Sequence, residues 1–508
     1  MISETDAVAR HEVVVVGAGP VGLSTALFLA DRGVQVLVVD KRDSLTAPPR
    51  AGTTVRTLEL FRAIGLGADL DRLCWDGPAP FRSMVKDRAN GAVQQEAALP
   101  ERYARLLAEC SPIGIRATMS QYEVQQLALT HLRRRGGHVR FGAEVVDFAV
   151  GDDAVRIRMD GAGPVVCRYL IGADGARSRI RELLGIGLPD RQVAARLNTA
   201  FFRADLRELL PESATHACFI RNEQVYCTLF AKGGNRWSSH LMDYPGKPDE
   251  LAMLSPEKTV RLLHEAIGEP LPIELIECTA WEAAIGTAGS FRAGPVFLAG
   301  DAAHVQSSAG GLGMNTGIQD GHNLAWKLAA VLRGTADQSL LDSYEPERRT
   351  AAEASLALSY RMHRGYCSHE DVNRLYARLA EDYLRGMMCY RYPADGAEDL
   401  GGNQAVPGAR LPHRWLADGL STLDLAGTGW ALLTGPDGAG WQAAGDRLDV
   451  RQLADSSVFT ELSGAEADGA LLVRPDGFVA WRCDRLPADP ADAVRSALRA
   501  VLRPPADR

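Results

Sequence analysis

Hydrophobic positions near the start of the chain follow the pattern of a strand, a helix and a second strand. Residues 12–16 are a β-branched run that ends at a glycine, which is typical of a buried central strand in a parallel sheet. Residues 34–39 form a second apolar run of the same kind. Between the two runs, four apolar residues recur at helical spacing: Leu23, Ala26, Leu27 and Ala30. The pattern predicts the first unit of an α/β domain.

Later segments predict a second sheet and then a return to the first domain. Strand-like patches at residues 199–202 and 224–230 favour an inserted sheet, which we interpret as a wall for the substrate. Residues 296–299 predict another buried strand, and apolar positions from 321 to 332 predict a long helix that ends near Gly334. From about residue 400 a loop-rich stretch leads to two more strands, at 430–433 and 470–473, and a final helix.

Composition favours an ordinary globular protein of two or three domains. The chain has 508 residues, of which 46% are hydrophobic and 24% charged, and its net charge of -8 argues against nucleic acid or an anionic membrane as the partner. Its nine cysteines include no Cys-x-x-Cys pair, so we expect reduced cytoplasmic thiols, no dithiol motif and no metal site. We also expect neither a signal peptide nor a membrane span.

Residues 17–22, Gly-Ala-Gly-Pro-Val-Gly, follow the first predicted strand and resemble a dinucleotide-binding turn. Gly17 permits the tight turn, Gly19 lets backbone N–H groups approach a pyrophosphate, and Gly22 lets helix and strand pack closely. Asp40 follows the second strand, at the distance expected for an acid that accepts a hydrogen bond from ribose. These local features fit FAD or NAD and leave the choice between them open.

A second motif lies nearly three hundred residues downstream. Gly300 and Asp301 follow a buried strand, where a carboxylate can accept a hydrogen bond from a ribityl hydroxyl. Three glycines then let the chain run close to a ring, and the start of the next helix can stabilise negative charge there: Gly310, Gly311 and Gly313.

Taken together, residues 17–22, 300–315, 169–179 and 49–61 resemble the para-hydroxybenzoate hydroxylase and phenol hydroxylase family of single-component flavin monooxygenases. The resemblance covers essentially the whole chain. It implies a discontinuous Rossmann-like FAD domain (1–185 and 290–398), a mainly β substrate domain (186–289) and a thioredoxin-like domain without redox cysteines (399–508).

The resemblance also assigns residues to the FAD site. Met314 and Asn315 would meet the flavin edge, and Asp174 would help to hold both FAD and the nicotinamide donor, although an ordinary turn explains Asp174 as well. Further cofactor contacts are expected from Pro20, Lys41, Arg50 and Gln121. His304 is expected to belong to the loop scaffold, and residues 344–349 to form an ion-paired helix start. Residues 237–244 either line the substrate pocket or belong to the core.

One departure from the family pattern lies in the loop expected to press on substrate and flavin, formed by Ser307, Ser308, Gly310 and Gly311. Ser307 and Ser308 stand where the family usually has proline, and serine restores an N–H donor and adds a hydroxyl. This departure keeps open how the substrate is positioned and which reaction is catalysed. No catalytic side chain is assigned with certainty.

The resemblance implies an FAD-dependent monooxygenase that consumes NADPH or NADH and dioxygen. It would hydroxylate a bulky, electron-rich aromatic compound derived from a polyketide, through a flavin C4a-hydroperoxide. Three alternatives remain: Baeyer-Villiger oxygen insertion, an NAD-dependent dehydrogenase and a non-catalytic FAD-binding protein. The expected partner is a small molecule, and a homodimer is one candidate assembly.

Overall fold

The computed structural model describes most of the chain. The described residues are 9–45, 52–73, 82–98, 101–114, 119–210, 217–232, 234–247, 252–368, 370–388, 390–392, 404–416 and 419–502. Arg50, expected at the cofactor site, lies outside these ranges. No helix in the described part of the chain is long and apolar enough to cross a membrane.

The first domain is built on a sheet with a parallel core. Strand β1 (Ala9–Val16) pairs in parallel with β2 and β8, and Val13, Val14 and Val15 are fully buried. Such strands are apolar on both faces because helices cover the sheet. The strands are β14 (Arg292–Ala293), β15 (Val296–Leu298), β8 (Val165–Gly172), β1, β2 (Val36–Val39) and β5 (His138–Arg140), with β6 (Glu144–Val150) and β7 (Val155–Asp160) attached through β8. Helices α1 (Pro20–Asp31) and α5 (Gln121–Arg134) contact the sheet, and α8 (Leu312–Leu332) packs on α1.

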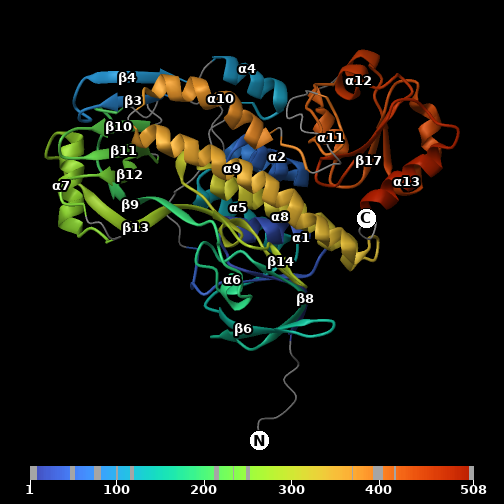
Figure 1. The fold of residues 1–508 in the computed structure, drawn as a ribbon, viewed down its shortest axis with the longest axis horizontal. Coiled ribbons are helices and arrows are strands. Elements are labelled where there is room, and N and C mark those ends of the chain that lie inside the picture. The colour runs from blue at the N-terminus through green and yellow to red at the C-terminus, as the bar shows by residue number, and fades with distance from the viewer. Residues whose placement is uncertain are drawn as a thin grey trace, which may run out of the picture.

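The second domain is an eight-stranded sheet, seen in green and blue in Figure 1, that is larger than the sequence predicted. Its strands in order are β16 (His304–Val305), β13 (Glu274–Thr287), β9 (Gln192–Arg203), β12 (Arg236–Asp243), β11 (Tyr226–Ala231), β10 (Ala217–Arg221), β3 (Arg82–Lys86) and β4 (Val93–Ala98). Helix α7 (Pro256–Ile267) packs on this sheet.

The predicted boundary of 186–289 for the second domain therefore misses three strands of this sheet. β3, β4 and β16 come from segments that the sequence assigned to the first domain. β3 pairs in parallel with β10, which lies more than a hundred residues further along the chain. A pairing of this kind leaves no local signal in the hydrophobic pattern, because each strand alone fits either sheet.

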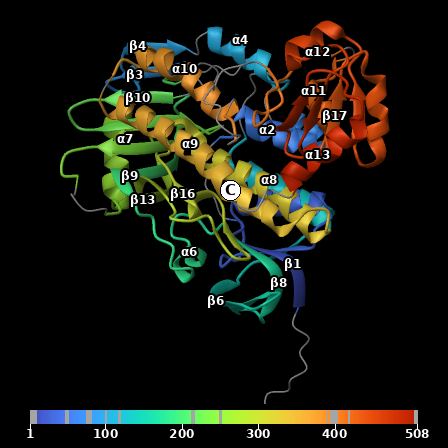
Figure 2. The ribbon, with the colours of Figure 1, turned by 45° about the vertical axis from the view of Figure 1, so that its right-hand side comes forward.

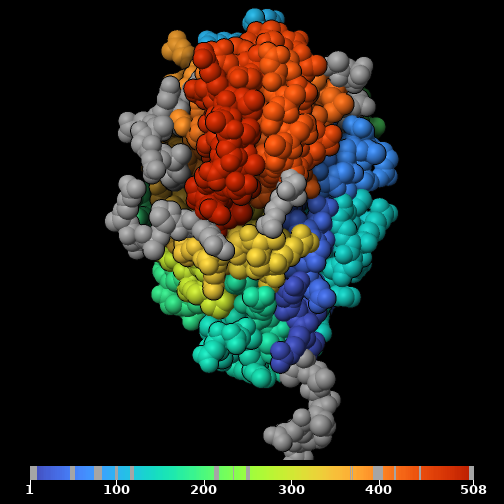
Figure 3. Space-filling model, turned by 90° about the vertical axis from the view of Figure 1, so that its right-hand side faces the viewer, coloured from blue at the N-terminus to red at the C-terminus, as the bar shows by residue number. Residues whose placement is uncertain are grey.

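The C-terminal domain has a four-stranded sheet in the order β18 (Asp449–Gln452), β17 (Ala431–Thr434), β19 (Ala470–Val473) and β20 (Val479–Cys483). β17 and β18 are parallel, whereas β19 and β20 are antiparallel, and α12 (Ser456–Ser463) and α13 (Pro490–Leu502) complete the unit. This mixed sheet fits the predicted thioredoxin-like fold. The domain lies on the side away from the second sheet (Figure 1 and Figure 2), and it fills the upper part of the face in Figure 3.

Two long helices connect the domains. Helix α9 (Tyr344–Cys367) crosses the middle of the molecule in Figure 1, and α10 (Val372–Met388) packs against it. The smaller helices are α2 (Val55–Phe61), α3 (Gly67–Leu73), α4 (Glu101–Cys110), which packs against α10, α6 (Arg179–Leu183) and α11 (Thr422–Ala426).

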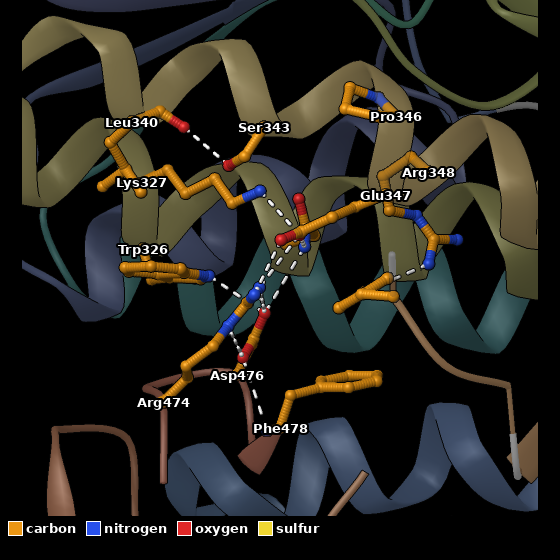
Figure 4. A network of polar contacts seen from close by, with 12 residues as sticks. Trp326, Lys327, Leu340, Ser343, Pro346, Glu347, Arg348, Arg474, Asp476 and Phe478 are labelled. Carbon is orange, nitrogen blue, oxygen red and sulfur yellow. Dashed lines mark hydrogen bonds and ion pairs between the residues drawn. The ribbon is translucent and has the colours of Figure 1, made fainter. Parts of the chain in front are cut away.

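A buried ionic network joins the start of α9 to the C-terminal domain (Figure 4). The Glu347 carboxylate accepts from Lys327 Nζ at 2.7 Å and from Arg474 at 2.7 and 2.9 Å. Arg474 also binds Asp476, which accepts a hydrogen bond from the Trp326 indole at 3.0 Å. The prediction that residues 344–349 form an ion-paired helix start is thereby confirmed, and one of its partners, Arg474, lies in the C-terminal domain.

Candidate cofactor and substrate site

The glycine turn after β1 is crowded on one side and open on the other. A Cβ atom on Gly17, whose φ is +109°, would lie 2.3 Å from the Ala173 carbonyl oxygen, and one on Gly22 would lie 1.9 Å from the Gly17 oxygen. A Cβ on Gly19 would meet nothing within 4 Å. Because Gly19 and Pro20 line the main cavity at the start of α1, this bare backbone leaves room for a phosphate at the helix N-terminus.

Asp40 directly follows β2 and accepts hydrogen bonds from the glycine turn and from its own loop. Its Oδ2 accepts from the Ala18 N–H at 2.6 Å, and its Oδ1 accepts from the Arg42 N–H at 2.8 Å. Asp40 and Lys41 also line the cavity, so a ribose hydroxyl would be a further partner of a carboxylate that is already engaged. Lys41 lies 3.5 Å from Glu144 at the exposed rim.

Asp174 and Gln121 come from two other elements that end at the same cavity. Asp174 follows β8 and caps α6, accepting from the Ser178 hydroxyl at 2.5 Å and from the Ile180 N–H at 3.1 Å. The turn that the sequence left as an alternative is therefore present: both carboxylate oxygens of Asp174 accept hydrogen bonds within it, and the residue lines the cavity. Gln121 is the first residue of α5, next to the capping residue Ser120.

Asp301 lies at the opposite end of the same cavity wall. Gly300, with a φ of +61°, turns the chain after β15, and the Asp301 side chain is exposed to the cavity. Enclosure by the protein raises the pKa of this carboxyl, while the nearby His304 acts in the opposite direction. His304 itself is fully buried and contacts Asp320 at 2.7 Å, which agrees with a scaffold role.

The glycine-rich loop after Ser308 is held by the long helices. Gly310 and Gly311 have φ of +80° and +65°, and the Tyr383 hydroxyl of α10 donates to the Gly310 carbonyl at 2.9 Å. Ser307 is buried, with its hydroxyl accepting from the Ala309 N–H, whereas Ser308 is exposed to the cavity.

Met314 lines the cavity in the first turn of α8, as does Gly313, but the Asn315 side chain does not. The Asn315 amide accepts from the Thr54 N–H and the Thr57 hydroxyl, and it donates to the carbonyls of Gly52 and Gly311. These four hydrogen bonds direct the amide towards α2. If Asn315 contacts the flavin edge, it can therefore do so only through its backbone atoms.

All these elements surround one continuous cavity of about 2280 Å³. Pockets for a single small ligand usually measure about 300–1,000 Å³, so this space can hold a dinucleotide and a second large molecule together. One end is the carboxyl edge of the first sheet, and the other is a face of the second sheet. α9 and α10 close it with Met362, Tyr366, Tyr376 and Tyr383.

The second sheet contributes residues that the sequence reading did not single out. Strand alternation sends Trp237 and Leu241 of β12 into the domain core and His240 and Met242 to the cavity, so both readings of residues 237–244 hold in part. Thr199 Oγ1 lies 2.8 Å from His240 Nδ1 and accepts from the indole N–H of Trp281 at 2.7 Å. The alternation of side chains along these strands could have indicated that such residues share one face. It does not by itself say which face of the sheet meets a cavity.

The donors and open backbone around this cavity fit FAD. The bare turn at Gly19 and the N-terminus of α1 suit a pyrophosphate, while Asp301 and the first turn of α8 suit the ribityl chain and the ring. The positive end of α8 can stabilise negative charge on a reduced ring. Asp40, Asp174 and Gln121 remain proposed cofactor contacts.

Comparison with protein families gives two matches that together span most of the chain. Residues 10–359 match the family described as FAD binding domain. Residues 404–505 match the family described as aromatic-ring hydroxylase, C-terminal.

Curated relatives align over nearly the whole length. A tetracenomycin A2 monooxygenase-dioxygenase of Streptomyces glaucescens is 35% identical, with 96% of each chain covered. An aklavinone 12-hydroxylase of Streptomyces purpurascens is 34% identical, with 97% of this chain and 98% of that protein covered.

Solved structures agree with this fold. The ternary complex of aklavinone-11 hydroxylase with FAD and aklavinone has a TM-score of 0.86 and 34% identity, and covers 97% of this chain and 99% of its own. The flavin-dependent monooxygenase PieE with FAD and substrate has a TM-score of 0.83 and 28% identity, and covers 98% and 99%.

Proposed function

The chain belongs to the family of FAD-dependent aromatic-ring hydroxylases, and from this premise we propose that it hydroxylates a polycyclic, polyketide-derived aromatic compound at the expense of NADPH or NADH and dioxygen. The observation that carries the proposal is the single cavity that runs from the glycine turn past Asp301 to the wall of the second sheet. A cofactor at one end would place its ring within reach of a large planar molecule at the other.

The aromatic side chains at the second end suit such a molecule. Phe219, Phe230 and Trp281 line the wall, and flat apolar rings favour stacking of a planar polycycle. Polar groups between them, including Thr199 and His240, would orient its oxygen substituents.

The protein's own contribution is position, charge and the exclusion of water. When bound and reduced by the nicotinamide donor, FAD supplies dioxygen activated at flavin C4a. The tyrosines of α9 and α10 cover the cavity, and burial raises the pKa of Tyr383 to about 12, so its hydroxyl stays protonated while it donates to Gly310. A dry, closed cavity protects reactive oxygen species from decay.

Product analysis with labelled dioxygen tests the proposal. We expect incubation of the FAD-loaded protein with NADPH and a panel of polycyclic phenols and quinones to insert one labelled oxygen atom, detected by mass spectrometry. Fragment masses would distinguish ring hydroxylation from insertion into a ring to give a lactone, the Baeyer-Villiger outcome. Turnover of NADPH with no labelled product for any member of the panel would contradict the proposal.

Asp301→Ala is expected to weaken FAD binding about 10- to 100-fold, because a charge-assisted hydrogen bond is worth about 1.5–3 kcal/mol. Titration of the apoprotein with FAD, followed by flavin fluorescence, measures the change. Asp205→Ala, at an exposed carboxylate outside the cavity, is the matched control and should bind FAD as the wild type does. An unchanged dissociation constant in Asp301→Ala would remove this residue from the FAD site.

A further inference from the structure

Lys232, on the substrate wall, differs from the other lysines of the chain in its contacts. Strand alternation places Thr228, Phe230 and Lys232 on the same face of β11 and its end, and all three line the cavity. The Lys232 ammonium lies 5.7 Å from the centre of the Phe230 ring. A cationic group is therefore presented to the part of the cavity where an aromatic substrate would bind.

The Lys232 ammonium has no oxygen partner among the described residues, although the backbone N–H of Lys232 donates to the Arg236 carbonyl. The structure describes all six lysines of the sequence. The other five each contact an oxygen: Lys41 that of Glu144, Lys86 that of Ala89, Lys247 that of Met242, Lys258 that of Gly246 and Lys327 that of Glu347. Burial lowers the pKa of Lys232 to about 8, and no carboxylate in the described part of the chain offsets this effect. A buried ammonium without a counter-charge is costly, and an anion would stabilise it.

The surroundings of Lys232 favour an anion carried by an aromatic ring. The His240 ring meets Phe230 edge-on at 5.6 Å, so the two residues flank one apolar surface. Beside this surface, Thr199 Oγ1 accepts from the Trp281 indole N–H at 2.7 Å and lies 2.8 Å from His240 Nδ1, so polar groups border the rings.

Other charged residues line the cavity near this wall, namely Arg236, Glu282 and Arg191. Arg236 lies on the adjacent strand and lines the cavity. Glu282, the cavity-lining carboxylate of β13, is engaged by Arg191 and Arg196. An acidic group on the substrate would therefore not compete with Glu282 for Lys232.

Building on the proposed function, we propose that Lys232 binds an ionised oxygen substituent of the aromatic substrate, a phenolate or a carboxylate, while the substrate ring packs against Phe230. Lys232 would then select substrates by charge and hold one edge of the ring system at the sheet wall. An ammonium close to a phenol in a site of low dielectric also favours the phenolate.

Binding of three anthraquinones to the FAD-loaded protein tests this role. The probes are 2-hydroxyanthraquinone, anthraquinone-2-carboxylate and unsubstituted anthraquinone. We expect Lys232→Met to bind the two acidic probes about tenfold more weakly and the neutral probe as the wild type does. We also expect bound 2-hydroxyanthraquinone to ionise about one pH unit below the free dye in the wild type, as seen by difference absorption, and this shift to vanish in Lys232→Met.

Two variants serve as controls. Lys258→Met makes the same change in the same domain, at a lysine that contacts Gly246 and Tyr244 outside the cavity, and should leave all three affinities unchanged. Lys232→Arg keeps the charge and should retain most of the binding of the acidic probes. The acidic probe that loses more affinity in Lys232→Met identifies phenolate or carboxylate as the preferred anion.

The outcomes separate this inference from the proposed function. Acidic probes bound equally well by wild type and Lys232→Met would overturn the inference, as would an equal loss of all three probes. If labelled oxygen were still incorporated, the proposed function would stand. Failure of the wild type to bind any of the three probes would overturn the inference, and failure of the labelled-oxygen assay as well would overturn both.

Discussion

Glu347→Gln is expected to lower the apparent melting temperature by about 6–10 °C, the largest stability effect of any single change considered for this chain. Glu347 is almost fully buried and neutralises two cations, Lys327 and Arg474. Removing one partner of a buried pair costs about 3–5 kcal/mol because the remaining charge is left without compensation. Here Lys327 would lose its carboxylate partner, and Arg474 would keep only Asp476.

The charge of Glu347 also makes the stability depend on pH. Burial alone would raise the pKa of its carboxyl, but Arg474 and Lys327 outweigh this effect and hold the pKa below the ordinary value of 4.5. A carboxyl whose pKa is lower in the folded state stabilises the protein fully above the pKa of the unfolded chain and loses this effect as the pH falls. The wild type should therefore lose stability more steeply than Glu347→Gln when the pH falls below about 4.5.

Differential scanning fluorimetry across this pH range provides the measurement. Glu274→Gln is the matched control, because Glu274 pairs with Arg203 at the surface, where such pairs contribute about 0–1 kcal/mol. Since Arg474 and Asp476 belong to the C-terminal domain, the loss should be seen in the unfolding of both domains. A melting temperature within about 1 °C of the wild type would show that the network contributes little.

Gly19→Val is expected to weaken FAD binding at least about 100-fold while leaving the apoprotein folded. Its Cβ would meet no protein atom within 4 Å, and its backbone has an ordinary φ of -71°. The added side chain would instead occupy the space at the N-terminus of α1 where a pyrophosphate must approach the backbone. The only expected cost to the fold is the loss of glycine at the N-cap, about 1 kcal/mol.

Two control variants test whether the loss of FAD affinity in Gly19→Val comes from the pyrophosphate site. Gly163→Val, in open space away from the cavity, should change neither FAD affinity nor melting temperature by much. Gly22→Ala should lower the melting temperature itself, because its Cβ would collide with the Gly17 carbonyl oxygen. FAD titration by calorimetry together with melting of the apoprotein separates the two cases. Wild-type affinity in Gly19→Val would place the pyrophosphate elsewhere.

Much of this molecule is encoded in short stretches of sequence. The run from Val13 to Val16 forms the expected buried strand, and the carboxylates and all the glycines predicted for the cofactor except Gly22 line one cavity, from Gly19 and Asp40 to Asp301. Turns, helix starts and buried strands depend on neighbours within a few residues. Resemblance to a family supplied the order in which these local signals come together.

The direction of the Asn315 side chain and the number of strands in the second sheet could not be predicted from such local patterns. Asn315 turns its amide to Thr54 and Thr57, about 260 positions earlier in the chain, and β3 joins the second sheet through β10. The two serines that stand where the family usually has proline also differ in a way that only the fold determines. Ser307 is buried, whereas Ser308 is exposed to the cavity.

The sequence by itself determined the local elements, the glycine turn and the positions of the carboxylates, because each depends on spacing along the chain. Only the tertiary structure decided which side chains share the cavity, that Lys232 lacks a counter-charge there among the described residues, and that Glu347 meets Arg474. The reason is physical: burial and the pairing of charges depend on distances in space between segments far apart in sequence, and hydrophobic periodicity carries no information about those distances.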